Sequence, residues 1–242
     1  MNVIGTIAEV TLRALLGRRR TILLLLLAGL PVLVALLARL GGGRLDAAPI
    51  LDAMIVRLVL PLTALVFGTA ALGSELDDGT AVYILLKPVA RWQVVIAKVG
   101  VAGLLSAALA VGSSLLTGVL AGGAGPTSIG TTLGVAFATG FAAFAYTALF
   151  VAASAVTSRA LVFGLVYVLI WEGVLAGILE ATKIVSVREA TLGLASALAP
   201  VESRIPAGLN PSQAVLLLGL ILAGGIFVAS VRLASYEVRG TE

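Results

Sequence analysis

The sequence contains no cysteine and no histidine, and only 12% of its 242 residues are charged. Without cysteine, the chain forms no disulfide and offers no thiolate to a metal or a substrate. Without histidine, it lacks the commonest metal ligand and the usual imidazole base. A Ser-His-Asp triad and an HExxH zinc site are therefore excluded, and a membrane protease or metal-dependent hydrolase is not expected.

Two further absences narrow the classes of function that are compatible with the sequence. The chain has no GxxxxGK[ST] phosphate-binding loop, so it does not hydrolyse ATP alone. Aromatic residues make up 5% of the sequence, which leaves no evident platform for stacking bases. We predict that the chain is not an enzyme, holds no cofactor or metal and has no nucleic-acid partner.

Apolar residues dominate what remains. They make up 60% of the chain, and the mean hydropathy is +1.15. A soluble domain is about half apolar and a quarter charged, so the solvent of this chain must be lipid. Runs long enough to cross a bilayer occur six times, at Thr21–Leu40, Met54–Gly73, Val94–Ala121, Thr131–Val156, Leu161–Leu179 and Ala214–Val231.

These runs predict an all-α membrane protein with six transmembrane helices in a single transmembrane domain, 1–242. Its parts are an interfacial helix (1–20), the first two spans (21–73), a cytoplasmic connector (74–93), three further spans (94–179), an outer loop with short helices (180–210), and the last span with its tail (211–242).

Basic residues set the expected orientation. With the N-terminus in the cytoplasm, 10 of the 16 Lys and Arg residues lie inside and 6 lie outside. The cluster Arg18, Arg19 and Arg20, just before the first span, is the strongest single signal. The positive-inside rule therefore places both termini in the cytoplasm.

Residues 1–20 have the periodicity of an amphipathic helix. Val3, Ile7, Val10 and Ala14 recur on one face, and Asn2, Thr6, Glu9 and Arg13 on the other. We expect this helix to lie in the membrane interface, with Arg18, Arg19 and Arg20 as anchors at the headgroups. The alternative is a plain helical start to the first span.

Polar groups within the spans are candidate functional residues. Glu172 lies in the fifth span, where a carboxylate is costly and usually faces a partner or water. It predicts a polar contact inside the bundle or part of a substrate path, unless it lies near the outer interface with Trp171 as an anchor. Arg57 and Asp52 lie near the outer end of the second span, where they could pair with each other or with Glu172. For Asp52, we favour a side chain that reaches the surface.

The outer loop contains the segment "VSVREATLGLASAL". It is helical in pattern but too short and too charged to span a bilayer. We expect either a partly inserted helix that caps the outer mouth or a solvated loop helix.

The stretch 72–93, "LGSELDDGTAVYILLKPVARWQ", which contains the connector, gathers charge in an otherwise apolar chain. Glu75 and its neighbours favour the start of a short helix, and "DDGT" is typical of a turn. The apolar patch "AVYILL" follows and ends at Pro88. Arg91 begins the next span, and we expect Lys98 to reach toward the surface as an anchor. The pattern favours a short helix on the inner membrane surface, presented to a partner.

The longer stretch "SELDDGTAVYILLKPVARWQVVIAKV" resembles the cytoplasmic connector of ABC transporter permeases of the type-2 exporter superfamily. In that family, an acid near the end of the second span precedes Gly-Thr, a hydrophobic stretch, a basic-Pro pair, Arg and a Lys in the next span. The matching positions here are Glu75, Gly79, Thr80, Leu85, Leu86, Lys87, Pro88, Arg91 and Lys98. Outside the connector, the resemblance is one of layout.

The resemblance implies a permease of a prokaryotic cytoplasmic membrane. Such permeases pair as two membrane halves, as homodimers or heterodimers, and dock two separate ATPase subunits that bind ATP and Mg²⁺. The connector then acts as a coupling helix that fits a groove on the ATPase. The alternatives are a stand-alone channel or secondary transporter, which would favour charges deep in several spans or inverted repeats, and a membrane-embedded enzyme.

Overall fold

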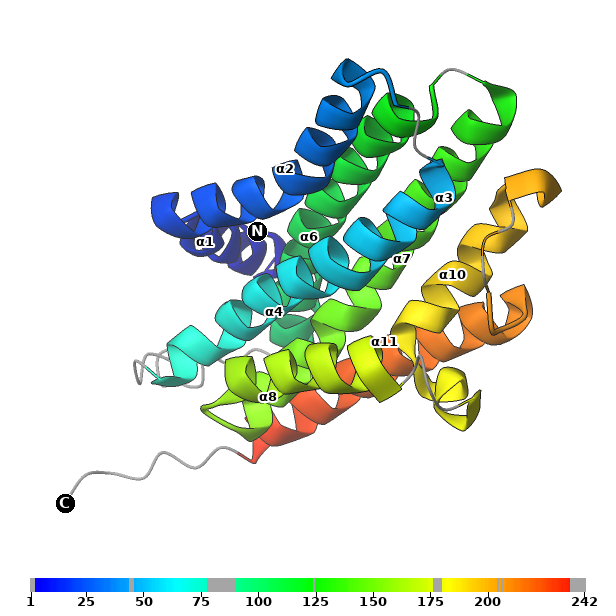
Figure 1. The fold of residues 1–242 in the computed structure, drawn as a ribbon. Coiled ribbons are helices and arrows are strands. Elements are labelled where there is room, and N and C mark those ends of the chain that lie inside the picture. The colour runs from blue at the N-terminus through cyan, green and yellow to red at the C-terminus, as the bar shows by residue number, and fades with distance from the viewer. Residues whose placement is uncertain are drawn as a thin grey trace.

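Long apolar helices form the body of the molecule (Figure 1). The computed structural model describes residues 3–43, 46–77, 90–123, 125–175, 180–203, 205 and 207–235, and these contain no strand. Within these ranges, five helical stretches are long and apolar enough to cross a membrane: Arg19–Leu40, Ala47–Gly73, Arg91–Gly122, Pro126–Val156 and Pro211–Ala234. The predicted all-α membrane fold is confirmed.

The sixth crossing stays a prediction. Helix α8 (Ala160–Val166) continues into the π-helix η2 (Tyr167–Leu175), and its apolar part is Ala160–Val174. That part would be roughly 22 Å long at the α-helical rise, less than the roughly 30 Å of a hydrocarbon core. The rest of the predicted fifth span, 176–179, lies outside the described residues.

The second span is built from three helical pieces. A short α3 (Ala47–Ile50) leads into the π-helix η1 (Leu51–Val59), which continues as α4 (Leu60–Asp77). Pro61 has no N–H to donate, and the wide turns lie just before it. In a π-helix the backbone bonds run between residues five apart, so side chains at that spacing come close together. The predicted site residues Asp52 and Arg57 have this spacing.

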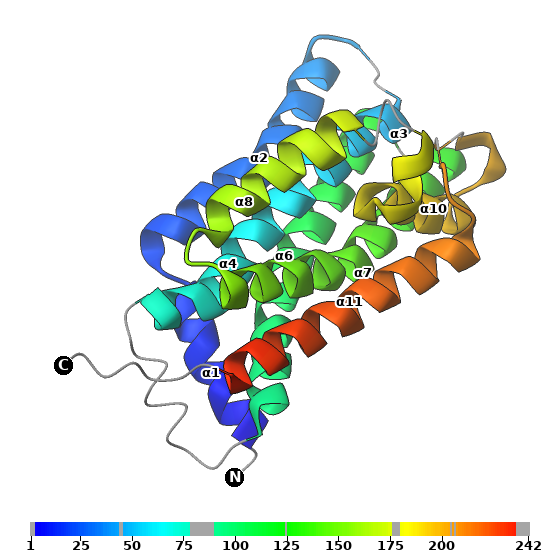
Figure 2. The ribbon, with the colours of Figure 1, turned by 90° about the horizontal axis from the view of Figure 1, so that it is seen from below.

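Helix α7 (Pro126–Val156) lies at the centre of the bundle (Figures 1 and 2). It packs along α6 (Arg91–Gly122), and α4 and α11 (Pro211–Ala234) also pack against it. Helix α2 (Arg18–Leu40) packs on α6. A Cβ added at Gly225 of α11 would lie 2.6 Å from the Ala148 carbonyl oxygen, so the α7 and α11 backbones nearly touch. Small residues make this close packing possible.

The first helix, α1 (Val3–Leu15), packs against α6 and α4. Its Leu15 is buried in a core cluster, and Ile7 packs against the same cluster. Val10, which the periodicity places with Ile7, is 61% exposed. An α-helix therefore covers Val3–Leu15, and the amphipathic helix expected in the membrane interface stays a prediction.

The predicted outer loop contains η3 (Glu180–Val185), α10 (Val187–Leu198) and η4 (Val201–Ser203). Every residue of α10 from Val187 to Ala195 is buried. The helix packs against α7, α11 and η1, so the alternative of a solvated loop helix is wrong. We call the end of the bundle that holds α3 and α10 the outer end, and the end with α1 and the last turn of α4 the inner end (Figure 2).

Candidate functional site

Glu172 lies at the centre of a buried polar cluster at the outer end. Glu172 is 5% exposed, and its two carboxylate oxygens accept four hydrogen bonds from described residues. The donors are the Tyr167 hydroxyl at 2.8 Å, the Ser186 hydroxyl at 2.6 Å, and the backbone N–H groups of Val187 at 2.9 Å and Arg188 at 3.3 Å. Glu172 therefore binds the N-terminus of α10, where a helix favours negative charge.

Arg188 joins this cluster to the second span. Its guanidinium lies 2.9 Å from Asp52 Oδ2 and 3.0 Å from Oδ1, and it donates to Glu189 Oε1 at 2.7 Å. All three residues are buried. Glu189 in turn accepts the N–H of Gly208 at 3.1 Å. One arginine thus holds α10 against η1 through a charge-assisted, bidentate pair.

Arg57 forms the exposed edge of the cluster. It lies 3.3 Å from Asp52, and its side chain is 47% exposed. The pairing of Arg57 with Asp52 agrees with one of the two pairings expected from the sequence. The favoured surface position of Asp52 is wrong, because Arg188, 136 residues away, binds that carboxylate inside the protein.

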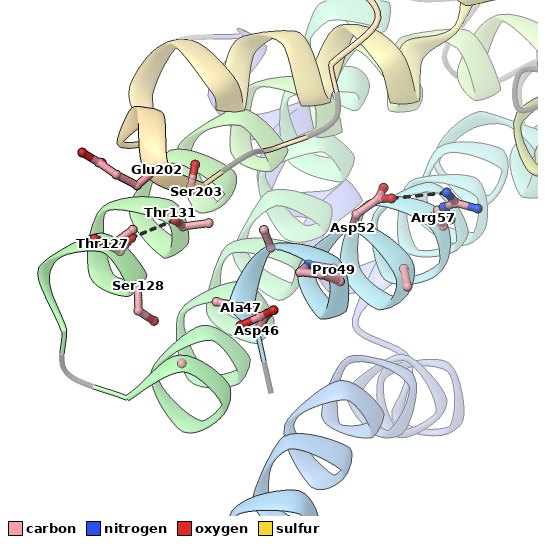
Figure 3. A pocket seen from close by; sticks show the side chains of 13 residues that line it. Asp46, Ala47, Pro49, Asp52, Arg57, Thr127, Ser128, Thr131, Glu202 and Ser203 are labelled. Atoms are coloured by element: carbon pink, nitrogen blue, oxygen red, sulfur yellow. Dashed lines mark hydrogen bonds and ion pairs between the residues drawn. The ribbon is translucent and has the colours of Figure 1, made fainter. Parts of the chain in front are cut away.

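A cavity of 930 Å³ opens beside Asp52 at the outer end (Figure 3). In the view of Figure 3, Asp52 and Arg57 lie on one side, and Glu202 and Ser203 of η4 lie across from them. Polar and charged side chains line much of it: Asp46, Asp52, Arg57, Thr127, Ser128, Thr131, Glu202 and Ser203. The outer end therefore has a largely polar recess, and Asp52 of the buried cluster forms part of its wall.

Most of the predicted coupling residues lie outside the described part of the chain. These are Gly79, Thr80, Leu85, Leu86, Lys87 and Pro88. Glu75 falls in the last turn of α4, and its side chain is likewise outside that part. Arg91 is the first residue of α6. The two helices that flank the connector, α4 and α6, pack against each other.

Lys98 is placed differently from the surface anchor expected from the sequence. Its side chain is 0% exposed, and its ammonium group donates to the carbonyl oxygen of Ala71 at 2.5 Å. A buried ammonium group is costly unless hydrogen bonds compensate it. Lys98 therefore ties the helix that follows the connector to the helix that precedes it.

The predicted headgroup anchors lie at the start of α2. Arg19 is exposed and Arg20 is half-buried, while the side chain of Arg18 lies outside the described part. Both described side chains are at the inner end of the first apolar stretch, which begins at Arg19.

Sequence reasoning missed Ser186, Arg188 and Glu189 as site residues. A signal was present, because Ser186 and Glu189 have the S-x-x-E spacing of a capping box. The Ser186 hydroxyl does accept the Glu189 N–H at 3.1 Å. Tyr167 was missed as well, since only a π-helical turn brings its hydroxyl to Glu172, five residues on.

A comparison with protein families gives a match over most of the chain. The sequence model of a family described as "ABC-2 family transporter protein" matches residues 19–223, from the start of α2 into α11. No protein in a search of curated sequences matches the chain.

Proposed function

This chain belongs to the ABC-2 transporter family and is a multi-pass membrane permease, and we propose that it is the permease subunit of an ATP-driven exporter. The observation that carries the proposal is the family match over residues 19–223, which takes in both helices beside the connector. Since the chain has no phosphate-binding loop, separate ATPase subunits bind ATP and Mg²⁺. Both chain termini and the connector lie in the cytoplasm, where those subunits are.

We place the ATPase contact at the connector, from Glu75 to Arg91. Helices α4 and α6 enter and leave it, and the Lys98 hydrogen bond to Ala71 joins them one or two turns into the bundle. A displacement of the connector would then move the two helices together. This supports a coupling role, because ATP-driven closure of the partner must bias the helices between two arrangements.

The translocation path is proposed to form between two permease chains. In the state described here, α10 fills the outer end of one chain, held by Glu172 and Asp52. An outward-open state would require the packing of α10 to change. The outer cluster is therefore the part of the chain where substrate release is controlled.

The test is purification of the tagged chain from its native membrane, followed by reconstitution in vesicles. We expect a polypeptide with a Walker A motif to co-purify, and ATP to be required for transport. A chain that purifies alone and moves solutes in vesicles without ATP would instead be a channel or a secondary transporter.

A further inference from the structure

A small cavity at the inner end lies where α2 begins, between α4, α7 and α8. Its volume is 210 Å³. Its walls are Arg20, Val66, Thr69, Ala70, Gly73, Ser154, Thr157, Ser158, Ala160 and Leu161. The cavity is thus enclosed by helices that are distant in sequence, and it is separate from the connector and from the outer cluster.

The cavity has a cation and no acid among its lining residues. In the described part of the chain, the Arg20 guanidinium forms no hydrogen bond or ion pair. A second arginine, Arg159, is exposed between two of the lining positions, Ser158 and Ala160. A positive pocket without its own counter-ion favours an anion.

Hydroxyl groups complete the polar lining. Thr69 and Ser154 donate to the carbonyls of their own helices, Leu65 and Val151, so their hydroxyl hydrogens are not available to an anion. Thr157 accepts the N–H of Arg159 at 3.2 Å, so its hydroxyl hydrogen remains available to an acceptor. Ser158 is exposed at the mouth.

The depth of the cavity identifies the source of the anion. The first apolar stretch begins at Arg19, α7 ends at Val156 and α8 begins at Ala160, so the cavity lies where the apolar segments end. The positive-inside rule assigns this boundary to the cytoplasmic leaflet. Phospholipid phosphates lie at this depth, and basic pockets between membrane helices on this side bind their headgroups.

We propose that this inner pocket binds the phosphate of a phospholipid headgroup. Arg20 pairs with the phosphate oxygens in a bidentate manner, and the hydroxyl groups of Thr157 and Ser158 donate to the same phosphate. Val66 and Leu161 contact the glycerol and upper acyl chain. The bound lipid links the start of α2 to α4, α7 and α8, so it stabilises the folded chain by mass action. This lipid site does not depend on the proposal that the chain binds a partner ATPase.

The experiment uses the full chain, delipidated in detergent with whatever subunits co-purify. The probes are phosphatidylglycerol, diacylglycerol with the same acyl chains, and inorganic phosphate. Lipid adducts are counted by native mass spectrometry, and the midpoint of thermal unfolding is followed as each probe is titrated. The variants are Arg20→Gln and, as a matched control at the other end of the same helix, Arg39→Gln, because Arg39 is exposed and does not line the cavity.

We expect phosphatidylglycerol to raise the unfolding midpoint of the wild type and of Arg39→Gln, with diacylglycerol and phosphate ineffective. Arg20→Gln should bind the lipid about tenfold more weakly, as a lost charge-assisted bond predicts. Arg20 has no bond to lose within the described chain, so this variant should unfold like the wild type when no lipid is added. Equal lipid affinity of the two variants would overturn the site. Protection by inorganic phosphate as strong as that by the lipid would overturn the lipid as its ligand.

Discussion

The carboxylate of Glu172 accepts the backbone N–H of Val187 at 2.9 Å, which fixes the first turn of α10 to the end of η2. A buried carboxylate at this place serves two purposes at once. It satisfies N–H groups that a helix leaves unpaired at its start, and it opposes the positive end of the helix dipole. The position of α10 therefore depends on the charge of one side chain within an apolar segment.

Replacing Glu172 with Gln should destabilise the protein. Each Glu172 oxygen accepts two hydrogen bonds, so an amide NH₂ in either position would face two donors. The expected cost is about 2 kcal/mol, or a fall of roughly 4–8 °C in the thermal midpoint in detergent. Glu202→Gln is the control, since Glu202 is exposed. Equal thermal midpoints in the two variants would show that Glu172 does not form the stabilising hydrogen bonds described here for its carboxylate.

The Asp52–Arg188 pair should contribute far more to stability than the Asp52–Arg57 pair. Asp52→Asn leaves a buried guanidinium with Glu189 as its remaining charged partner, and should cost about 3 kcal/mol. Arg57→Gln should cost about 1 kcal/mol or less, because that side chain is half exposed. Thermal unfolding of both variants, of Arg188→Gln and of the double variant Asp52→Asn/Arg188→Gln completes the comparison. Strictly additive effects of the Asp52 and Arg188 substitutions would show that the two groups do not interact.

The packing of α10 on α7 can be tested by cross-linking, because the chain has no cysteine. A Cβ at Gly134 would lie 3.2 Å from the Cβ of Ala199, slightly closer than the roughly 3.5–4.5 Å of a disulfide, so a shift of a few tenths of an ångström gives bonding geometry. Gly134→Cys/Ala199→Cys should therefore form a bond that a reductant reverses, detected by proteolysis and gel mobility. Gly112→Cys/Ala199→Cys is the control, since a Cβ at Gly112 meets nothing within 4 Å. Cross-linking in the control pair alone would contradict the described position of α10.

Lys98 should not be replaceable by Arg. The site is fully buried and admits an ammonium group that bonds to Ala71, whereas a guanidinium is larger, planar and needs more acceptors. We expect Lys98→Arg to lower the thermal midpoint at least as much as Lys98→Met. If Lys98 reached the membrane surface instead, Arg would substitute for it without loss of stability. A wild-type thermal midpoint in Lys98→Arg would therefore contradict the buried position of Lys98.

Hydropathy and charge were enough to predict the helical membrane fold, because bilayer thickness sets the length of an apolar run. They were less informative about individual charges. Asp52 was expected at the surface, but its partner Arg188 is brought to it by the folding of a distant segment. Lys98 was expected to reach the surface, but α4 offers it a carbonyl inside the bundle.

The outer cluster was only partly accessible from sequence. Glu172 could be selected because an acid in an apolar run is rare, and the Ser186–Glu189 spacing could have marked the start of α10. The π-helical turns could not be predicted, since no sequence pattern here distinguishes them from α-helix. They determine which side chains five residues apart meet, as Tyr167 and Glu172 do.

The central claim is that a partner ATPase acts on this chain through the connector, and substitution of the charged residue at each end of the connector tests that claim most directly. The measurement is the amount of ATPase that co-purifies with the tagged chain, with its substrate-stimulated hydrolysis rate, for Arg91→Glu and Glu75→Ala. Arg39→Glu is the matched control, since Arg39 is exposed in the last turn of α2 and lies outside the connector. We predict that both connector variants insert normally but lose co-purification or stimulated hydrolysis, while the control retains both. Wild-type co-purification and hydrolysis in the connector variants would contradict the account.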